Sequence, residues 1–434
     1  MRTATAGSIA LFSVAIAGCA IAQMSQAPPA SELQNSPFVV QSSPPSLWLE
    51  FPINEPSSCP GSLTIGADSQ IWFGDGCRAA IGKISNKGVA VEYAIPGAKT
   101  DEGVAVARGT APDVWFTVGA PDGSLENNIA GFISTDGSIT EFSLPSGTTP
   151  GRIAHGPDGN FWFTEPIGNN IVRITPSGKM TVFPVPSEKA YPNAIVRGPD
   201  GNMWFTESNN GAPGAVGQIT MQGKISEYRL EFAPESIAAA SDGGLWVSQS
   251  NGLHEVARIS TSGSVTYVPI GRRQGGGAVA PGPGGQPWYI VGNEFWHIIF
   301  PSDRPSIVTT IPGGYSSTGG MILGPDHNFW IAESARGAIG VYVRRQQMVT
   351  PSALTFSYIG EQQSFTVTET DFKGLFKESG CDPSIATVSP QGLATTFTVT
   401  AQGPGACIIS VTDEHRDLSH VNVSVSPGPS AQSK

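Results

Sequence analysis

Acidic side chains recur at a fixed distance behind tryptophan in this 434-residue chain. The tryptophans at positions 72, 162, 204 and 330 are each followed three residues later by a carboxylate, in the order Asp75, Glu165, Glu207 and Glu333. Carboxylate oxygens bind divalent cations and attract cationic ligands. The spacing therefore predicts carboxylates gathered at one end of a repeated element, with Glu333 and Asp75 as candidate ligands for Mg²⁺. In the alternative interpretation, Glu165 and Glu207 are solvated ends of a repeated Trp-Phe-Thr-Glu strand.

Three polar residues depart from the repeat, and they are the better candidates for function because a repeated residue suits architecture more than chemistry. These residues are Glu102, Asn193 and Glu235. We expect Glu102 and Asn193 to bind a ligand together with Glu165 and Glu207, and Glu235 and Glu333 to be the candidate acid or base groups.

Arginines could complement these acids. Arg152, Arg272 and Arg273 are expected near the same end, where they would bind an anionic substrate or form ordinary ion pairs. The six histidines show no His-x-x-x-His zinc spacing, and no nucleophile elbow, P-loop or dinucleotide fingerprint is present. A structural or surface role is therefore predicted for all of the histidines.

The element that positions these residues is a repeat. Seven tryptophans stand 42 to 47 residues apart, at positions 72, 115, 162, 204, 246, 288 and 330. A period just above 40 with turn residues inside each unit is typical of a four-stranded propeller blade. We predict an all-β chain with a seven-bladed β-propeller over residues 46–347, in which each tryptophan packs between neighbouring blades. The carboxylates would then border the mouth of the central channel, opposite the Pro-Asp-Gly turns.

Closure of the ring is predicted from a strand that lies before the first complete unit. Residues 47–53 match the outer-strand pattern of residues 139–145, and the seventh unit ends without an outer strand of its own. Adding residues 47–53 to that unit pairs an open sheet edge.

The sequence pattern changes after the propeller. Short alternating strands over residues 350–427 indicate a small immunoglobulin-like β-sandwich, and residues 428–434 are expected to be a disordered tail. Cysteine spacing predicts one disulfide in each domain, Cys59 with Cys77 and Cys381 with Cys407.

The N-terminus indicates export. Residues 1–22 have the charge and short apolar run of a signal peptide, with Cys19 in a lipobox-like setting and a competing small-residue cleavage site after it. The alternatives are a lipoprotein anchored through Cys19 and a cleaved periplasmic, cell-surface or secreted protein. Residues 23–45 are predicted to be a flexible linker. The net charge of −11 argues against nucleic acid and anionic membrane partners. A monomer is expected.

The repeated units Gly-Pro-Asp-Gly-Asn-Phe-Trp-Phe-Thr-Glu (156–165) and Gly-Pro-Asp-Gly-Asn-Met-Trp-Phe-Thr-Glu (198–207) resemble those of virginiamycin B (streptogramin B) lyases. The resemblance covers the propeller and implies elimination at an ester, in which a base removes the proton next to the carbonyl and Mg²⁺ stabilises the resulting charge. The resemblance also implies catalytic histidines at the positions that are Gly277 and Gly320 in this chain, and an acidic residue at the position of Thr318, so the family's catalytic histidines are absent here.

Two hypotheses follow. The first is an exported lyase-like propeller that binds a small molecule, glycan or peptide at the channel mouth. The second is a metal-dependent carbon–oxygen lyase or lactonase-like enzyme that acts on a cyclic ester with a base other than histidine.

Overall fold

The computed structural model describes two compact units, one over Leu47–Val343 and one from Arg344 onward. The described residues are 38–41, 47–53, 57–109, 113–119, 128–211, 213–240, 242–249, 255–269, 277–282, 287–291, 294–299, 304–310, 320–343, 347–369, 375–412 and 418–426. Almost all regular structure in them is β-strand, so the prediction of an all-β chain is confirmed. The short 3₁₀ turns are η1 (Asn209–Gly211) and η3 (Ser334–Arg336). No helix in these ranges is long and apolar enough to cross a membrane.

The larger unit is built from antiparallel sheets whose strands follow chain order. Six of the sheets described in this unit have four strands and are numbered here as sheets 1 to 6. Their strands are β3 (Pro60–Ile65), β4 (Ile71–Asp75), β5 (Ala80–Ile84), β6 (Ala90–Ala94); β7 (Gly103–Arg108), β8 (Val114–Gly119), β9 (Ile129–Ile133), β10 (Ile139–Ser143); β11 (Ile153–His155), β12 (Phe161–Glu165), β13 (Asn170–Ile174), β14 (Met180–Pro184); β15 (Pro192–Arg197), β16 (Met203–Glu207), β17 (Ala215–Ile219), β18 (Ile225–Arg229); β19 (Pro234–Ala239), β20 (Gly244–Gln249), β21 (Glu255–Ser260), β22 (Val265–Pro269); β23 (Val279–Pro281), β24 (Pro287–Val291), β25 (Glu294–Ile299) and β26 (Arg304–Thr310).

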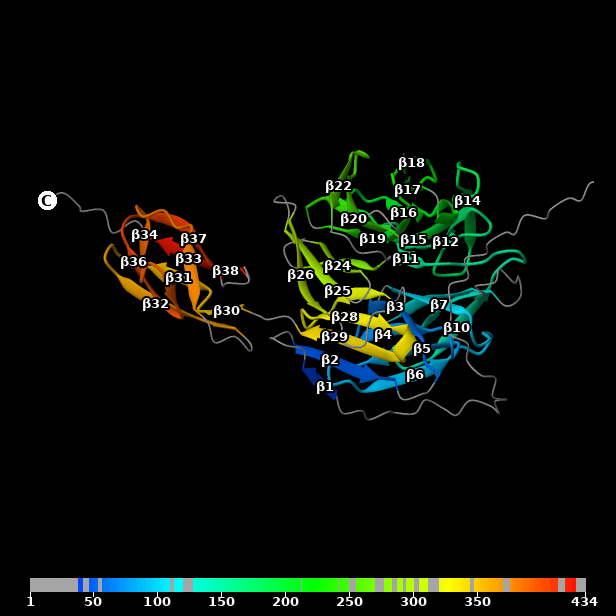
Figure 1. Ribbon diagram of the computed structural model, residues 1–434, viewed down its shortest axis with the longest axis horizontal. Coiled ribbons are helices and arrows are strands. Elements are labelled where there is room, and N and C mark those ends of the chain that lie inside the picture. Colours follow the sequence, from blue (N-terminus) through cyan, green and yellow to red (C-terminus); the bar gives the residue numbers. More distant parts are fainter. Residues whose placement is uncertain are drawn as a thin grey trace, which may run out of the picture. The chain divides into compact units, whose positions relative to one another are not determined.

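Sheet 7 joins the two ends of this unit. Its order is β1-β2-β29-β28-β27, from β1 (Phe38–Gln41), β2 (Leu47–Pro52), β27 (Met321–Leu323), β28 (Phe329–Glu333) and β29 (Ala338–Val343). Figure 1 shows the blue β2 beside the yellow β29, and the two pair antiparallel from Leu47 opposite Val343 to Pro52 opposite Ala338. The predicted closing strand is therefore present.

The linker prediction for residues 23–45 is wrong at residues 38–41. These residues form β1, which pairs antiparallel with β2. The aromatic and β-branched residues of Phe-Val-Val favour extended structure, and β2 would otherwise have left its outer edge unpaired. Sheet 7 consequently has five strands.

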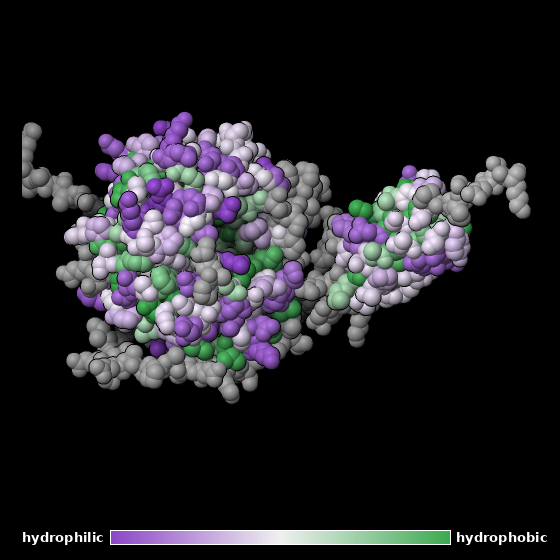
Figure 2. Space-filling model, turned by 180° about the vertical axis from the view of Figure 1, so that it is seen from behind, coloured by the Kyte–Doolittle hydropathy of each residue, from purple (hydrophilic) through white to green (hydrophobic). Residues whose placement is uncertain are grey.

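Each repeated tryptophan packs into the apolar cluster of the next sheet. Trp72 lies with Val104 and Phe116 of sheet 2, and the same step is taken by the tryptophans at 115, 162, 204, 246 and 288. Trp330 of sheet 7 returns to Leu63 and Phe73 of sheet 1. The predicted packing role of the tryptophans is confirmed, and the sheets follow one another as in a β-propeller. Figure 2 shows a hollow near the middle of this unit with hydrophobic residues inside it.

The Pro-Asp-Gly turns orient these tryptophans. In four turns the aspartate Oδ1 accepts a hydrogen bond from the indole Nε1 four residues later, at 3.0 to 3.1 Å, in the pairs Asp68–Trp72, Asp158–Trp162, Asp200–Trp204 and Asp326–Trp330. The same Oδ1 accepts the backbone N–H two residues on, as in Asp158 and Asn160. Gly159 has φ +77°, and His327 takes the corresponding position with φ 61°. The turn and the indole are thus fixed by one carboxylate.

The smaller unit contains two sheets around one core. The first is β30 (Gln347–Thr350), β32 (Gln362–Glu369), β36 (Thr396–Ala401) and β34 (Ala386–Ser389); the second is β31 (Ala353–Phe356), β38 (Leu418–Val425), β37 (Gly405–Thr412), β33 (Phe376–Ser379) and β35 (Leu393–Ala394). Phe365 and Phe397 of the first sheet share the core with Phe356 and Val423 of the second.

Both predicted disulfides are present. Cys59 is bonded to Cys77 in the larger unit and Cys381 to Cys407 in the smaller one, with Cα atoms 5.3 and 5.2 Å apart. The predicted signal peptide, Cys19 and the C-terminal tail lie outside the described residues.

Truncation tests closure of the ring. A chain that begins at Pro56 lacks β2 and leaves β29 unpaired, and it also loses the buried side chains of Trp48, Phe51 and Ile53. Burial of each such side chain contributes about 1.5–3 kcal/mol. We expect aggregation or loss of the cooperative thermal transition, measured by circular dichroism and light scattering. A chain that begins at Ser46 is the control, and equal melting of the two truncations would contradict closure by β2.

Candidate functional site

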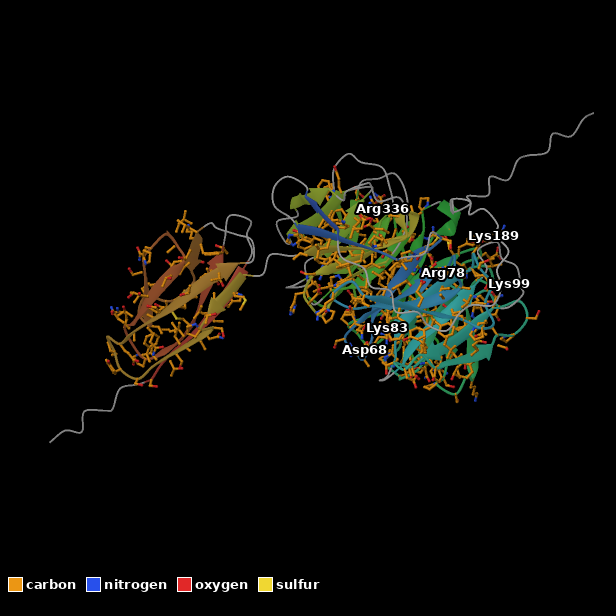
Figure 3. All side chains as sticks on the ribbon, turned by 90° about the horizontal axis from the view of Figure 1, so that it is seen from below. Asp68, Arg78, Lys83, Lys99, Lys189 and Arg336 are labelled. Carbon is orange, nitrogen blue, oxygen red and sulfur yellow. A yellow bond between two sulfur atoms is a disulfide. The ribbon has the colours of Figure 1, made fainter. Side chains whose placement is uncertain are left out.

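Each sheet of the propeller has two chemically different ends. Figure 3 shows Asp68 and Lys83 well apart from Arg78 and Arg336. Asp68 lies in the turn that joins the first two strands of sheet 1, whereas Arg78 and Arg336 follow the second strands of sheets 1 and 7. The starts of the innermost strands lie at the same end as Arg78 and Arg336, since neighbouring strands are antiparallel. We call this end the mouth.

Hydroxyl groups fix the starts of the inner strands from one sheet to the next. The side chains of Thr117, Thr164 and Ser248 donate to the backbone carbonyls of Gly151, Asn193 and Gly277 in the following sheet, at 2.7, 2.8 and 2.6 Å. Thr164 Oγ1 and Ser248 Oγ also accept the N–H groups of Arg152 and Ser236 in their own sheets, at 3.1 and 3.2 Å. These hydroxyl links connect successive sheets at the mouth and position the residues discussed next.

Glu235 is the centre of a cluster drawn from four successive sheets. Burial raises the pKa of Glu235 to about 7, while the Arg152 guanidinium and a hydrogen bond from the Gly277 N–H act in the opposite direction. Asn193 Nδ2 donates to the backbone carbonyl oxygen of Glu235, at 3.5 Å. Arg152, Asn193 and Glu235 were all predicted as site residues, and the structure brings them together.

This cluster offers complementary groups to a ligand. Glu235, Arg152 and Asn193 are all partly exposed, so they can contact a molecule at the mouth. A carboxyl group with a pKa near 7 exchanges its proton readily at neutral pH, and the guanidinium is a fixed positive charge. The cluster can therefore bind a polar ligand and can transfer a proton.

The repeated carboxylates differ from this cluster in that they are buried. Glu165 and Glu207 are buried, so their interpretation as solvated strand ends is wrong. Asn170 Nδ2 donates to Glu165 Oε2 at 2.7 Å. Burial, together with the charge of Glu227 on the outer strand β18, raises the pKa of Glu207 to about 8. Strand alternation was a signal for this burial, because Glu207 follows the fully buried Phe205 by two residues and shares its face.

Glu333 and Asp75 each have their own local partners. Asp75 accepts hydrogen bonds from Ser58 Oγ and from the Cys59 N–H. Burial and, to a smaller extent, the charge of Glu50 raise the pKa of Glu333 to about 8, against the opposing effect of Arg336, whose Nε is 3.4 Å from Glu333 Oε2. Arg336 also pairs with Glu50 at 2.7 Å. The contacts of Asp75 tie the second strand of sheet 1 to the segment before its innermost strand, and those of Arg336 tie the second strand of sheet 7 to its outer strand β2.

The described residues do not present the donor set that Mg²⁺ requires. Within the described ranges, no group of three or more His, Cys, Asp or Glu residues is placed to hold a metal ion. Mg²⁺ binds through carboxylate oxygens and water in octahedral geometry, and the carboxylates of Asp75 and Glu333 are engaged within their own sheets. The described residues therefore do not fit the metal.

Glu102 lies just before β7 and is buried. Its Oε2 accepts the Lys99 N–H at 2.9 Å, which closes the loop that leads into sheet 2. The structure does not show Glu102 as part of the Glu235 cluster.

Gly277 and Gly320 occupy the inner-strand positions at which the resemblance places histidines. A Cβ at Gly320 would come 2.9 Å from Leu63 N and 3.2 Å from Gly61 O, so a side chain requires a backbone shift. His155 is half-buried, packs on Phe161 and has a pKa lowered by burial, which agrees with a structural role. Thr318, Arg272 and Arg273 lie outside the described residues.

Outer-strand glutamates were missed. A glutamate followed by an aromatic residue recurs in these strands, and each glutamate binds a loop of its own sheet or the loop that enters it from the preceding sheet. Glu92 pairs with Arg78 at 3.1 Å, Glu141 accepts the Gly97 N–H, and Glu227 accepts the N–H of Ser187. Their regular Glu-aromatic spacing was visible in the sequence.

Comparison with known proteins decides the family. Residues 47–339 match the virginiamycin B lyase family. The chain belongs to this family. No curated protein matches it in sequence.

Solved structures of virginiamycin B lyases share the fold. A streptogramin B lyase structure is 26% identical, with a TM-score of 0.59 over 68% of this chain and 96% of that one. A catalytically inactive histidine-to-alanine variant of virginiamycin B lyase from Staphylococcus aureus, solved with quinupristin, has the same identity and TM-score over 68% and 98%. The extracellular domain of a putative hybrid two-component system from B. thetaiotaomicron is similar in fold, at 14% identity and TM-score 0.52 over 90% of this chain and 63% of that one.

The charge of Arg152 is expected to control Glu235. Because Arg152 lowers the pKa of Glu235, replacing Arg152 by Gln should move that pKa upward from about 7. In Lys189→Gln, which removes an exposed charge, it should stay unchanged. Carbon-detected NMR titration of the Glu235 carboxyl measures the shift. An unchanged pKa in Arg152→Gln would show that the two groups do not interact.

Proposed function

We propose that the chain is an exported seven-bladed propeller that binds a small molecule, glycan or peptide at its mouth, followed by an immunoglobulin-like sandwich. The convergence of Arg152, Asn193, Glu235 and the Gly277 N–H carries this proposal. These groups come from four consecutive sheets: the Arg152 charge and the Gly277 N–H act on the Glu235 carboxyl group, and Asn193 donates to the Glu235 backbone. Concave sites with a few convergent polar groups are the usual ligand sites of such folds.

The remaining parts of the proposal rest on separate observations. The tryptophan contacts from sheet 1 to sheet 7 and back support seven blades. Two sheets around one core, over residues 350–427, support the immunoglobulin-like sandwich. Two disulfides support export, because such bonds persist in oxidising compartments. Anchoring through Cys19 and a monomeric state are part of the same proposal.

Thermal-shift screening of the exported chain tests ligand binding. We expect small molecules, oligosaccharides or peptides that raise the melting temperature of the wild type to lose that effect in Glu235→Gln. The matched control is Glu188→Gln, which removes the same charge from an exposed position. Ligands that stabilise Glu235→Gln as strongly as the control would place binding elsewhere.

A second candidate function is catalytic. The pKa of about 7 favours Glu235 as a base. In a carbon–oxygen lyase acting on a cyclic ester, Glu235 would take a proton from the carbon that lies between a carbonyl group and the oxygen-bearing carbon; a carbon–carbon double bond forms, the bond to the ester oxygen breaks and the ester leaves as a carboxylate. In a lactonase-like enzyme, Glu235 would take a proton from water as that water attacks the ester carbonyl, and no step of either reaction is assigned to a metal.

Streptogramin B ring opening separates the two candidates. We expect the purified chain with Mg²⁺ to show no ring opening above background, because Gly277 and Gly320 carry no imidazole. The double variant Gly277→His/Gly320→His should also stay inactive, since the Gly320 position is crowded and acid, base and metal groups act as a unit. The readout is loss of the intact ring by liquid chromatography. Ring opening by the wild type that Glu235→Gln abolishes would favour the enzyme.

A further inference from the structure

A groove opens at the turn end of the propeller, between sheets 7 and 1, away from the mouth. Its volume is about 430 Å³. It is lined by the turn residues Asp68 and Asn86 of sheet 1 and by Asp326 and Trp330 of sheet 7, over the apolar side chains of Ile71 and Ile84. Asp68 Oδ2 is buried and has no hydrogen-bond partner among the described residues.

The corresponding places in two other sheets are filled by the chain's own cations. In sheet 1, Lys83 lies opposite Trp72, with Nζ 5.2 Å from the Trp72 ring centre and 3.2 Å from the carbonyl oxygen of Thr135 in the next sheet. In sheet 3, Arg173 lies opposite Trp162, with Cζ 5.4 Å from that ring.

Arg173 completes the same pattern of contacts. Its guanidinium is 3.7 Å from Asp158 in the turn of its own sheet and donates to the carbonyl oxygen of Met221 in the next sheet, at 3.0 Å. In sheet 5, Arg258 pairs with Asp242 at 2.8 Å. A cation in this position thus contacts a tryptophan ring, the turn aspartate of its own sheet, or the neighbouring turn.

Sheet 7 has no cation at this position. The residue opposite Trp330 is Val341, which is buried and apolar. The groups that contact the cation in the other sheets are nevertheless present here. They are the Trp330 ring, which is stacked on Phe51 at 6.0 Å, the turn aspartate Asp326, and the turn of sheet 1 that contains Asn86. Asn86 stands two residues before the turn glycine Gly88, as Thr135 stands before Gly137 and Met221 before Gly223.

We propose that this groove binds a cationic group from outside the propeller, the guanidinium or ammonium group of a basic peptide side chain. The cation lies at Trp330, is attracted by Asp68 and Asp326, and donates to the Asn86 carbonyl. It reproduces the contacts that Arg173 and Lys83 make within the chain. Cation–π contact and charge-assisted hydrogen bonding favour such a group over a neutral one.

Calorimetry on the full chain with N-acetyl-argininamide, N-acetyl-lysinamide and the neutral N-acetyl-citrullinamide tests the proposal. We expect the two cations to bind and citrulline to bind about tenfold more weakly or not at all, as loss of one charge-assisted hydrogen bond predicts. A preference for arginine matches the contacts of Arg173, and one for lysine those of Lys83. Equal binding of citrulline, or no binding of either cation, would overturn the proposal.

Two variants locate the binding in the groove. Val341→Arg supplies an internal cation at the position of Arg173 and should abolish binding, while Val341→Leu should retain it. Asp68→Asn keeps an Oδ1 for the Trp72 indole but removes the charge, so it should weaken binding about tenfold without lowering the melting temperature. Binding that persists in both Val341→Arg and Asp68→Asn would place the cation elsewhere. Glu235→Gln should have no effect, which separates this test from that of the mouth.

Discussion

The bond between a turn carboxylate and a buried indole organises the propeller. Asp158 accepts both the Trp162 Nε1–H and the backbone N–H of Asn160, so the turn and the ring are fixed together. The ring then fills the space against Ile195 and Phe205 of the next sheet. An indole N–H buried in that apolar contact would be costly without a partner. One side chain thus links the local turn to the contact between sheets, and this link recurs in four of the sheets.

Polar groups at the other end divide into two sets with different roles. Carboxylates of the second and outer strands, such as Glu333 and Glu50, are buried and bridged within one sheet by Arg336. The inner-strand starts, by contrast, are joined between sheets through hydroxyl links and keep partly exposed side chains. This division explains why Glu235, and none of the repeated carboxylates, lies among groups from several sheets.

Sequence reasoning reached the architecture because its signals are local and periodic. The tryptophan spacing and Pro-Asp-Gly turns fix strand order, and the match of residues 47–53 to an outer strand was enough to predict closure. The burial of Glu207 was not predicted, because its alternation with Phe205 on the same face of the strand was overlooked. The environment of Glu235 could be predicted only in outline, since the Gly277 N–H and Arg152 approach it from separate sheets. Strand β1 was missed because its pairing depends on an edge created only by closure.

The hydroxyl links at the mouth donate to a backbone carbonyl oxygen, and the side chain of the accepting residue takes no part in the bond. Thr164 donates to the backbone carbonyl oxygen of Asn193, not to its side-chain amide. Ser248 donates in the same way to Gly277, which has no side chain. The same link therefore holds residues with and without a side chain, as at Asn193 and Gly277, whereas a Cβ at Gly151 would come 2.6 Å from Thr164 Oγ1 and would require a local shift. The residue type at such a place can therefore change in one blade alone, and each change alters one of the groups that the mouth presents to a ligand.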